Sequence, residues 1–210
     1  MIPVLLIAAA LGASAPAAFA ATLGPGFDCT RATGEAQALV CADAQLATLD
    51  REISRLYTLA SHSPQLDTKQ RGRLRAYQIG WIRGRNDCWK AIDLRSCVLD
   101  SYVTRIHELR RDYPAARSAD ADGISSGPAG VACEGTGRRM AATFIHTDPP
   151  LACLELPDHA YVMTLKPAAP AARYVASTNQ GDVAFWTKGD TARLQMPGRA
   201  AINCTIEAPR

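Results

Sequence analysis

The sequence predicts a multi-domain α-then-β protein: a small disulfide-linked antiparallel helical bundle followed by an eight-stranded antiparallel β-barrel. Two observations predict this fold class. Apolar residues recur at helical spacing before residue 113, and short alternating runs follow residue 130. Residues 113–130 are small and polar and show no period. We therefore expect a helical domain over 21–112, a flexible linker over 113–130 and a barrel domain over 131–210.

The first 20 residues predict export. They have an apolar core, become Ala-rich and end in Ala18-Phe19-Ala20, which is typical of a signal-peptide cleavage site before Ala21. The alternative is an uncleaved anchor, but the run is broken by Ala and Gly and falls short of the ~20 strongly apolar residues that a span needs. The expected location is periplasmic or secreted, in a Gram-negative bacterium, with no stable membrane insertion after cleavage.

Three helices are predicted in the first half, each from an apolar stripe at spacings of three and four residues. The stripes contain Leu46, Leu49, Ile53, Leu56 and Ala60; Leu74, Tyr77 and Trp81; and Leu99, Tyr102, Ile106 and Leu109. Ser63 and Pro64 are expected to begin the second helix as its cap and first-turn residue. Short loops between the helices favour an antiparallel bundle, and disulfides would support so small a core.

The cysteines fit an oxidising compartment, where such residues usually pair. The sequence has Cys29, Cys41, Cys88, Cys97, Cys133, Cys153 and Cys204. In an antiparallel helical hairpin the start of the first helix lies beside the end of the second. The preferred pairing is therefore Cys29–Cys88 with Cys41–Cys97, although four cysteines allow three connectivities. No C-x-x-C and no histidine at zinc-ligand spacing is present, so no metal site is predicted.

Charge and motifs argue against several function classes. The net charge is +3, from 23 Lys and Arg against 20 Asp and Glu, and it is spread over both halves without a basic stripe, so nucleic acid is not an expected partner. Residues 123–127 match the G-x-S-x-G nucleophile pattern but lie in the expected linker, without the strand and helix that the motif requires. The four histidines are scattered. Neither an enzyme nor a cofactor is predicted.

The segment from Val183 to Leu194 predicts a β-hairpin. Two alternating apolar runs meet at Gly189-Asp190, a pair that suits a type II′ turn. Lys188 would then stand at the lip of the turn, on a strand braced by Trp186. A lysine at a hairpin edge is ordinarily a solvated residue that discourages edge pairing, and this remains the simpler interpretation of the residue alone.

This hairpin resembles the C-terminal half of the c-type lysozyme inhibitor family (MliC/PliC), in which a Trp-x-Lys-Gly-Asp hairpin presents a lysine to the lysozyme active site. The closing residues Asn203-Cys204-Thr205, Glu207 and Pro209 also match that family. The resemblance implies an eight-stranded barrel, in agreement with the alternating runs. Cys133–Cys204 would join its first and last strands, and Cys153 would remain a buried thiol or form an intermolecular bridge.

The mechanism implied by the resemblance is occupancy of the lysozyme cleft. Lysozyme cleaves with two carboxylates, and a lysine ammonium that enters the cleft can bond to one of them. Such a charge-assisted bond is worth about 1.5–3 kcal/mol. Lys188 is the expected contact, supported by Tyr174 and Trp186. Without long-range steering between two basic proteins, inhibition would rest on local, shape-driven insertion.

One inserting residue of the family is altered. Its serine, in a Ser-Gly-x-x-Tyr loop, falls on Pro170, while the tyrosine is kept as Tyr174. Proline has neither a hydroxyl nor an N–H, so it cannot donate a hydrogen bond to a catalytic carboxylate. Ser177 and Thr178 in the following loop are the candidates to replace the serine, against the simpler interpretation of an ordinary polar hairpin loop.

A second resemblance covers nearly all of the helical half. The order Cys–Cys, Gln78-x-x-Trp81, Arg85-x-x-Cys88 and Cys97 is similar to the LprI-type N-terminal domain, a small secreted bacterial module linked to lysozyme inhibition. The two resemblances imply an exported lysozyme inhibitor, with c-type lysozyme as its partner.

The alternative is a non-catalytic cell-envelope or peptidoglycan-binding module without lysozyme inhibition. Trp81, Trp89, Tyr77 and Tyr102 could form a sugar-stacking surface in such a module. Helical spacing favours core packing for most of these aromatic residues. Trp89 is the one expected to be exposed.

Overall fold

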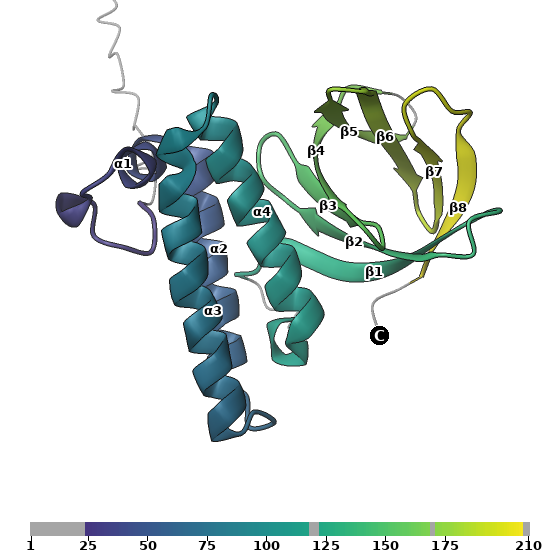
Figure 1. The fold of residues 1–210 in the computed structure, drawn as a ribbon. Coiled ribbons are helices and arrows are strands. Elements are labelled where there is room, and N and C mark those ends of the chain that lie inside the picture. The colour runs from purple at the N-terminus through teal and green to yellow at the C-terminus, as the bar shows by residue number, and fades with distance from the viewer. Residues whose placement is uncertain (1–23, 118–121, 169–170, 208–210) are drawn as a thin grey trace, which may run out of the picture.

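The computed structural model describes residues 24–117, 122–168 and 171–207, in which a helical domain lies beside a closed β-barrel (Figure 1). The expected signal peptide and Pro170 lie outside these residues. None of the helices described is both long and apolar enough to span a bilayer.

The helical domain is built around α2 and α4, whose predicted apolar stripes are buried except for the half-buried Leu99. Its elements are η1 (Cys29–Arg31), α1 (Glu35–Ala42), α2 (Ala44–Ser61), α3 (Thr68–Asn86), η2 (Asp87–Lys90), α4 (Leu94–Asp112) and η3 (Pro114–Arg117). The short α1 is an addition to the three predicted helices. In Figure 1, α4 lies between α3 and the barrel.

The start of α3 corrects the sequence prediction. Asp67, and not Ser63, caps this helix: its carboxylate accepts from the Gln70 N–H at 2.7 Å, while the Gln70 side chain accepts from the Asp67 N–H at 2.8 Å. This capping box satisfies two backbone donors that a helix N-terminus otherwise leaves unpaired. Ser63 lies in the preceding turn, where its hydroxyl accepts from the Gln65 N–H.

The predicted disulfide pairing of the helical domain is wrong. The bridges are Cys29–Cys41 and Cys88–Cys97, with Cα–Cα distances of 5.9 and 5.6 Å. The prediction placed Cys29 and Cys41 beside the far end of a two-helix hairpin. Instead α1 folds back on η1, and η2 folds back on the start of α4, so each bridge closes a local loop of the chain.

The barrel has the eight antiparallel strands that the sequence predicts, and each pairs with its neighbours in chain order. They are β1 (Ser125–Cys133), β2 (Arg139–Ile145), β3 (Leu151–Glu155), β4 (Ala160–Lys166), β5 (Ala172–Thr178), β6 (Gly181–Lys188), β7 (Thr191–Gln195) and β8 (Ile202–Glu207). Pairing of β1 with β8 closes the barrel, and Cys133–Cys204 joins these two strands as predicted.

The segment expected to be a flexible linker is largely part of the fold. Residues 114–117 form η3, and β1 begins at Ser125, inside the predicted linker. The Arg110 side chain, in α4, donates from Nε to the Gly127 carbonyl at 2.7 Å. The two domains are therefore docked against each other, and the barrel begins earlier in the chain than expected.

One wall of the barrel is buried on both faces. In β3, Ala152 and Leu154 point into the barrel, while Leu151 and Cys153 join the core of the helical domain together with Ile145 of β2. α4 packs against β1, β3 and β4 on this side (Figure 1). The helical domain and the outer face of the barrel thus share one hydrophobic core.

Polar contacts fix the orientation of the two domains. The buried His107 of α4 lies 2.8 Å from the Thr143 hydroxyl through Nδ1 and 2.9 Å from the Glu155 carboxylate through Nε2. Arg111 pairs with the same carboxylate. Burial raises the pKa of Glu155, but the hydrogen bond and charge of His107 and the charge of Arg111 outweigh it, so the pKa lies below its ordinary value.

Candidate functional site

The predicted hairpin is present and ends in a two-residue turn. β6 and β7 pair up to Lys188 and Thr191, leaving Gly189-Asp190 as the loop. Gly189 has φ +61°, whereas Asp190 has no positive φ. A type I′ turn needs positive φ at both central residues, so this backbone agrees with type II′. The Thr191 hydroxyl donates to the Lys188 carbonyl at 2.8 Å and closes the turn.

The neighbouring strand braces this turn. The Ile206 N–H of β8 donates to the Asp190 carbonyl at 2.7 Å. Ala192 lies opposite Cys204, whose disulfide joins β8 to β1. Lys188 is therefore carried on a short turn that is held by a third strand and, through the disulfide, by a fourth.

The Lys188 side chain is exposed beside a shallow groove of about 440 Å³. The groove is lined by Ala171, Trp186, Thr187, Lys188, Thr191, Ala192, Arg193, Asn203, Cys204 and Thr205. In the part of the chain that the structure describes, no carboxylate forms an ion pair with Lys188. Its ammonium is available to an acceptor outside the protein.

Trp186 and Tyr174 support the hairpin in different ways. Trp186 is half-buried on the outer wall, where the Arg173 guanidinium lies 5.4 Å from its ring. Tyr174 is buried inside the barrel, with its ring 5.6 Å from that of Phe144, and burial raises the pKa of its phenol. Tyr174 thus packs beneath the hairpin and does not itself form part of an external contact surface.

Ser177 and Thr178 lie at the opposite end of the barrel from Lys188, which corrects the expectation that they act with it. They flank the β5–β6 turn, whereas Lys188 ends β6 at the β6–β7 turn. The length of β6 separates the two turns by roughly 20 Å. The Ser177 hydroxyl donates to the Asp182 carboxylate at 2.8 Å, and the Thr178 hydroxyl donates to the Gly181 carbonyl at 2.7 Å.

The connection between β4 and β5 does lie beside Lys188. Ala172 pairs with Thr187, and Ala171 lines the same groove as Lys188. This connection contains Pro170, the position of the family serine, which lies outside the described residues. The altered loop and the lysine hairpin therefore belong to one end of the barrel.

The aromatic residues of the helical domain divide between core and surface. Tyr102 is fully buried and donates to the Asp50 carboxylate at 2.7 Å, while Trp81 packs edge-on against it at 5.3 Å. The Arg85 guanidinium lies near both rings. Tyr77 and Trp89 are exposed, as the sequence predicted for Trp89. A four-residue sugar-stacking surface is therefore not formed.

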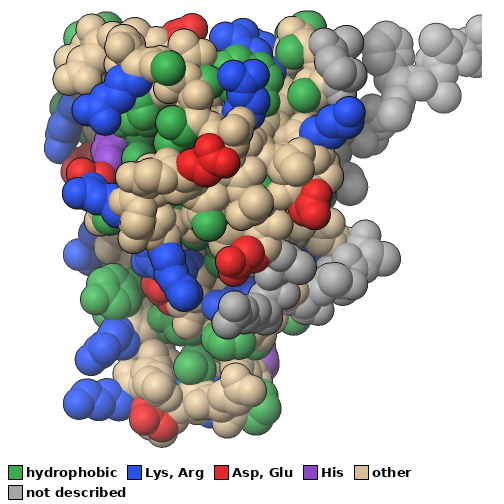
Figure 2. Space-filling model, turned by 90° about the vertical axis from the view of Figure 1, so that its right-hand side faces the viewer, with side chains coloured by type: hydrophobic (Ala, Val, Ile, Leu, Met, Phe, Trp, Pro, Cys, Tyr) green, Lys and Arg blue, Asp and Glu red, His purple; other side chains and the backbone are tan. Residues whose placement is uncertain are grey.

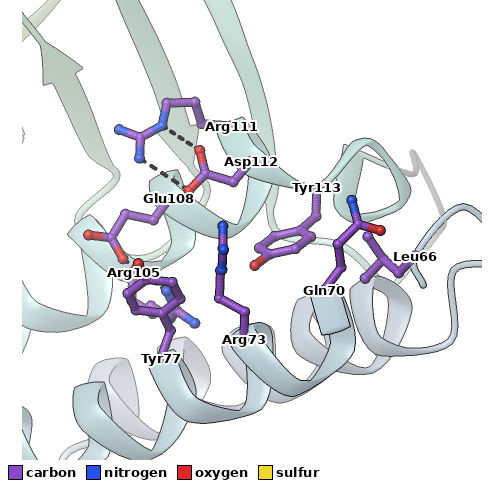
Figure 3. A pocket seen from close by; sticks show the side chains of 9 residues that line it. All are labelled: Leu66, Gln70, Arg73, Tyr77, Arg105, Glu108, Arg111, Asp112 and Tyr113. Atoms are coloured by element: carbon purple, nitrogen blue, oxygen red, sulfur yellow. Dashed lines mark hydrogen bonds and ion pairs between the residues drawn. The ribbon is translucent and has the colours of Figure 1, made fainter. Parts of the chain in front are cut away.

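A groove that sequence analysis missed lies between α3 and α4 (Figure 3). It measures about 500 Å³, and Arg73 reaches into it between Tyr77 and Tyr113. Arg105 is held by Gln78 at 3.0 Å and by Glu108 at 3.0 Å. The spacing of Arg73 and Tyr77 at i and i+4 indicates that they share one face of a helix. The residues across the groove could not be located in this way, because they belong to a helix about 30 positions away.

The G-x-S-x-G segment has a structural place in the domain interface. The Ser125 hydroxyl donates to Glu52 of α2 and accepts from Arg110 at 3.3 Å. Across the described ranges, no cluster of three or more His, Cys, Asp or Glu side chains is placed to hold a metal ion.

The comparisons with known proteins divide the chain at the same place as the structure. Residues 131–203 match the family model MliC, described as membrane-bound lysozyme-inhibitor of c-type lysozyme. Residues 29–109 match the family model of lysozyme inhibitor LprI. No solved structure matches the chain significantly.

The curated relatives are proteins named lipoprotein LprI from Mycobacterium bovis and from two strains of Mycobacterium tuberculosis. Each is 35% identical over 111 residues, which cover 52% of this chain and 54% of the relative. The chain thus spans about half the length of the curated relatives it matches. Together the matches identify an LprI-type helical domain followed by an MliC-type β-barrel in one polypeptide.

Proposed function

We propose that this protein is an exported inhibitor of lysozyme and that its barrel blocks the active-site cleft with the Lys188 hairpin. The observation that carries the proposal is the exposed ammonium of Lys188, without a carboxylate partner among the described residues, on a braced two-residue turn within the segment that matches the c-type inhibitor model. The c-type enzymes are the proposed targets because that model's description names them.

The proposed contact is a charge-assisted hydrogen bond between Lys188 and a catalytic carboxylate. In a cleft emptied of water such a bond contributes about 1.5–3 kcal/mol. The bracing of the turn by β8 lowers the entropy that the hairpin loses on insertion. The groove from Trp186 to Thr205 supplies surrounding surface for contact with the rim of the cleft. Substrate is excluded by occupancy, and no bond in the inhibitor is made or broken.

The docked helical domain leaves this hairpin accessible. α4 packs on the β1, β3 and β4 side, and in a closed barrel of eight strands β6 and β7 lie across from β2 and β3 (Figure 1). Acidic and basic side chains are interspersed over the barrel side of the molecule (Figure 2). No broad field of one sign therefore repels a basic enzyme from this side, and local shape decides the fit.

The experiment is the lysis of Gram-positive cells by c-type lysozyme with added chain 21–210. We expect the parent to slow lysis and the Lys188→Ala variant to lose at least about tenfold in potency. Arg199→Ala is the matched control, because it removes an exposed cation from the opposite end of the barrel. Equal inhibition by the parent and Lys188→Ala would assign the activity to another surface.

The α3–α4 groove supports a second candidate function, binding of a cell-wall glycan. Tyr77 offers an exposed ring, and Arg73 has no ion-pair partner among the described residues and could meet a sugar carboxylate (Figure 3). Sedimentation with insoluble peptidoglycan in the absence of lysozyme tests it. Binding that is lost in Arg73→Ala and kept in Lys188→Ala would favour this function over inhibition by the barrel.

A further inference from the structure

The exposed large hydrophobic side chains of the described residues gather in one short stretch of the chain. They are Tyr77 (62% exposed), Ile79 (43%), Ile82 (38%), Trp89 (58%) and Ile92 (110%). All lie on α3 or on the connection from α3 to α4. Single exposed apolar residues are ordinary, but a concentration of this kind marks an interaction surface.

The same helix is strongly basic. α3 contains Lys69, Arg71, Arg73, Arg75, Arg83 and Arg85 and no acidic residue. Only Arg85 among these is buried. The small net charge of the whole chain hides this local excess, which corrects the expectation that the sequence has no basic stripe.

The charges and the apolar groups follow an order along α3. Four of the exposed cations, Lys69 to Arg75, lie in its first half. Tyr77, Ile79 and Ile82 lie in its second half, together with the exposed Arg83. At 3.6 residues per turn, Arg75, Ile79 and Ile82 share one side of the helix, away from the buried Leu74. Trp89 and Ile92 extend the apolar end beyond the helix, with the Lys90 ammonium 5.4 Å from the Trp89 ring.

Nothing in the described chain covers this face. Arg75, Ile79 and Ile82 are all exposed, and a Cβ added at Gly72, near the same side of the helix, would meet no atom within 4 Å. α3 lies on the side of the helical domain away from the barrel (Figure 1). The face is therefore an unpartnered helix surface that is open along its length.

We propose that this α3 face rests on the surface of an anionic phospholipid bilayer. A helix without acidic residues selects an anionic partner, and a second copy would set two basic helices against each other. A soluble polyanion would bind the cations but would not bury the exposed side chains of Ile79, Ile82 and Ile92. In a bilayer, isoleucines enter the boundary of the acyl chains, Trp89 sits at headgroup level, and the cations meet lipid phosphates.

This orientation leaves the Lys188 hairpin free. α3 and the β6–β7 wall lie on opposite sides of the molecule, with α4 and the barrel between them (Figure 1). The protein would adsorb through its helical domain and present the barrel away from the lipid. The inference does not depend on lysozyme being the partner of the barrel.

The test is co-sedimentation of the chain 21–210 with vesicles, which keeps the apolar leader out of the measurement. We expect binding to phosphatidylglycerol–phosphatidylcholine vesicles, weakened by salt, and none to phosphatidylcholine alone. Ile82→Ser with Ile92→Ser should weaken binding at least about tenfold. Arg75→Gln should weaken it about fivefold, whereas Arg199→Gln on the barrel should leave it unchanged.

Three results would overturn the proposal. One is equal binding to anionic and neutral vesicles, and another is anionic binding that the Ile82 and Ile92 changes do not alter. The third is self-association in solution that Ile82→Ser removes, which would assign the face to a second copy. Circular dichroism verifies that the variants fold. Inhibition of lysozyme by the doubly substituted chain is measured in parallel, so failure at the membrane is distinguishable from failure of the barrel's proposed function.

Discussion

Two opposite walls of the barrel differ in what they contact: one packs against the helical domain, and the other faces solvent. The β2–β3 wall is buried on both faces, with Leu151 and Cys153 packed into the core of the helical domain. The β6–β7 wall packs its inner face into the barrel core, carries no part of the helical domain's core and holds Lys188 in solvent. Domain docking is thus confined to one wall, and the other is left rigid and accessible. An activity of the hairpin should therefore be insensitive to damage at the docking wall.

The largest expected effect is on the wall that carries the hairpin. Replacing Cys133 and Cys204 together by Ser removes the bridge between the first and last strands. A loop of this size predicts a loss of about 4 kcal/mol in the free energy of unfolding. Urea denaturation of the parent provides the control: the reduced parent should agree with the variant in the barrel's transition, whereas the oxidised parent should be more stable than both. No change in stability would show that strand pairing alone closes the barrel.

The next effect is at the docking wall. Leu151→Ala should cost about 3 kcal/mol of folding free energy, because it leaves a cavity in the shared core. Gln195→Ala on the opposite wall is the control, because its side chain is exposed and lies outside the groove beside Lys188, and its expected loss is below about 0.5 kcal/mol. Lysozyme inhibition should survive both changes at temperatures where the protein is folded. Loss of inhibition in Leu151→Ala alone would mean that the helical domain takes part in the contact.

A smaller, pH-dependent effect comes from Glu155 in the same interface. Its lowered pKa means that the carboxylate stabilises the fold above the ordinary carboxyl value of about 4.3. That contribution is lost as the pH falls below this value and through the lowered pKa. Glu155→Gln should be less stable than the parent at pH 7 by about 1 kcal/mol and should approach it near pH 3. Thermal unfolding at several pH values measures this, and a constant difference would exclude the linkage.

The smallest expected effect concerns Cys153, which should not react with a thiol reagent in the folded protein. The thiol is free and fully buried, and burial raises its pKa to about 12. A thiol-specific reagent should therefore leave the native protein unmodified at pH 8 and label one cysteine after unfolding. Rapid labelling of the folded protein would show that the docking wall opens. Of the two roles left open by the sequence, the structure shows the buried thiol.

The sequence could predict what local pattern and closure determine. The sequence predicted the number of strands, although the first begins before residue 131, and closure of the sheet makes Cys133 and Cys204 neighbours. The sequence also contains a pattern that indicates domain docking. Leu151-Ala152-Cys153-Leu154 is an unbroken apolar run, which is typical of a strand covered on both faces. In the same way, Asp67-x-x-Gln70 marked the true start of α3.

The features that the sequence could not predict depend on contacts between distant segments of the chain. The pairings Cys29–Cys41 and Cys88–Cys97 follow from how α1 and η2 fold back, which no apolar stripe encodes. Arg73 lines one groove with Arg105 and Glu108 only because α3 packs beside α4. For Ser177 the error was avoidable, since successive turns of an up-and-down barrel alternate between its two ends.

The most direct test of the account is the affinity of the purified chain for c-type lysozyme by isothermal titration, with Lys188→Ala and Lys188→Met beside the parent. The account predicts a 1:1 complex for the parent and a Kd at least about tenfold higher for both variants, equal to a loss of about 1.4 kcal/mol or more. Methionine keeps most of the length of the side chain without its charge, so it separates the ammonium from simple occupancy. A parent-like affinity in both variants would contradict insertion of the lysine.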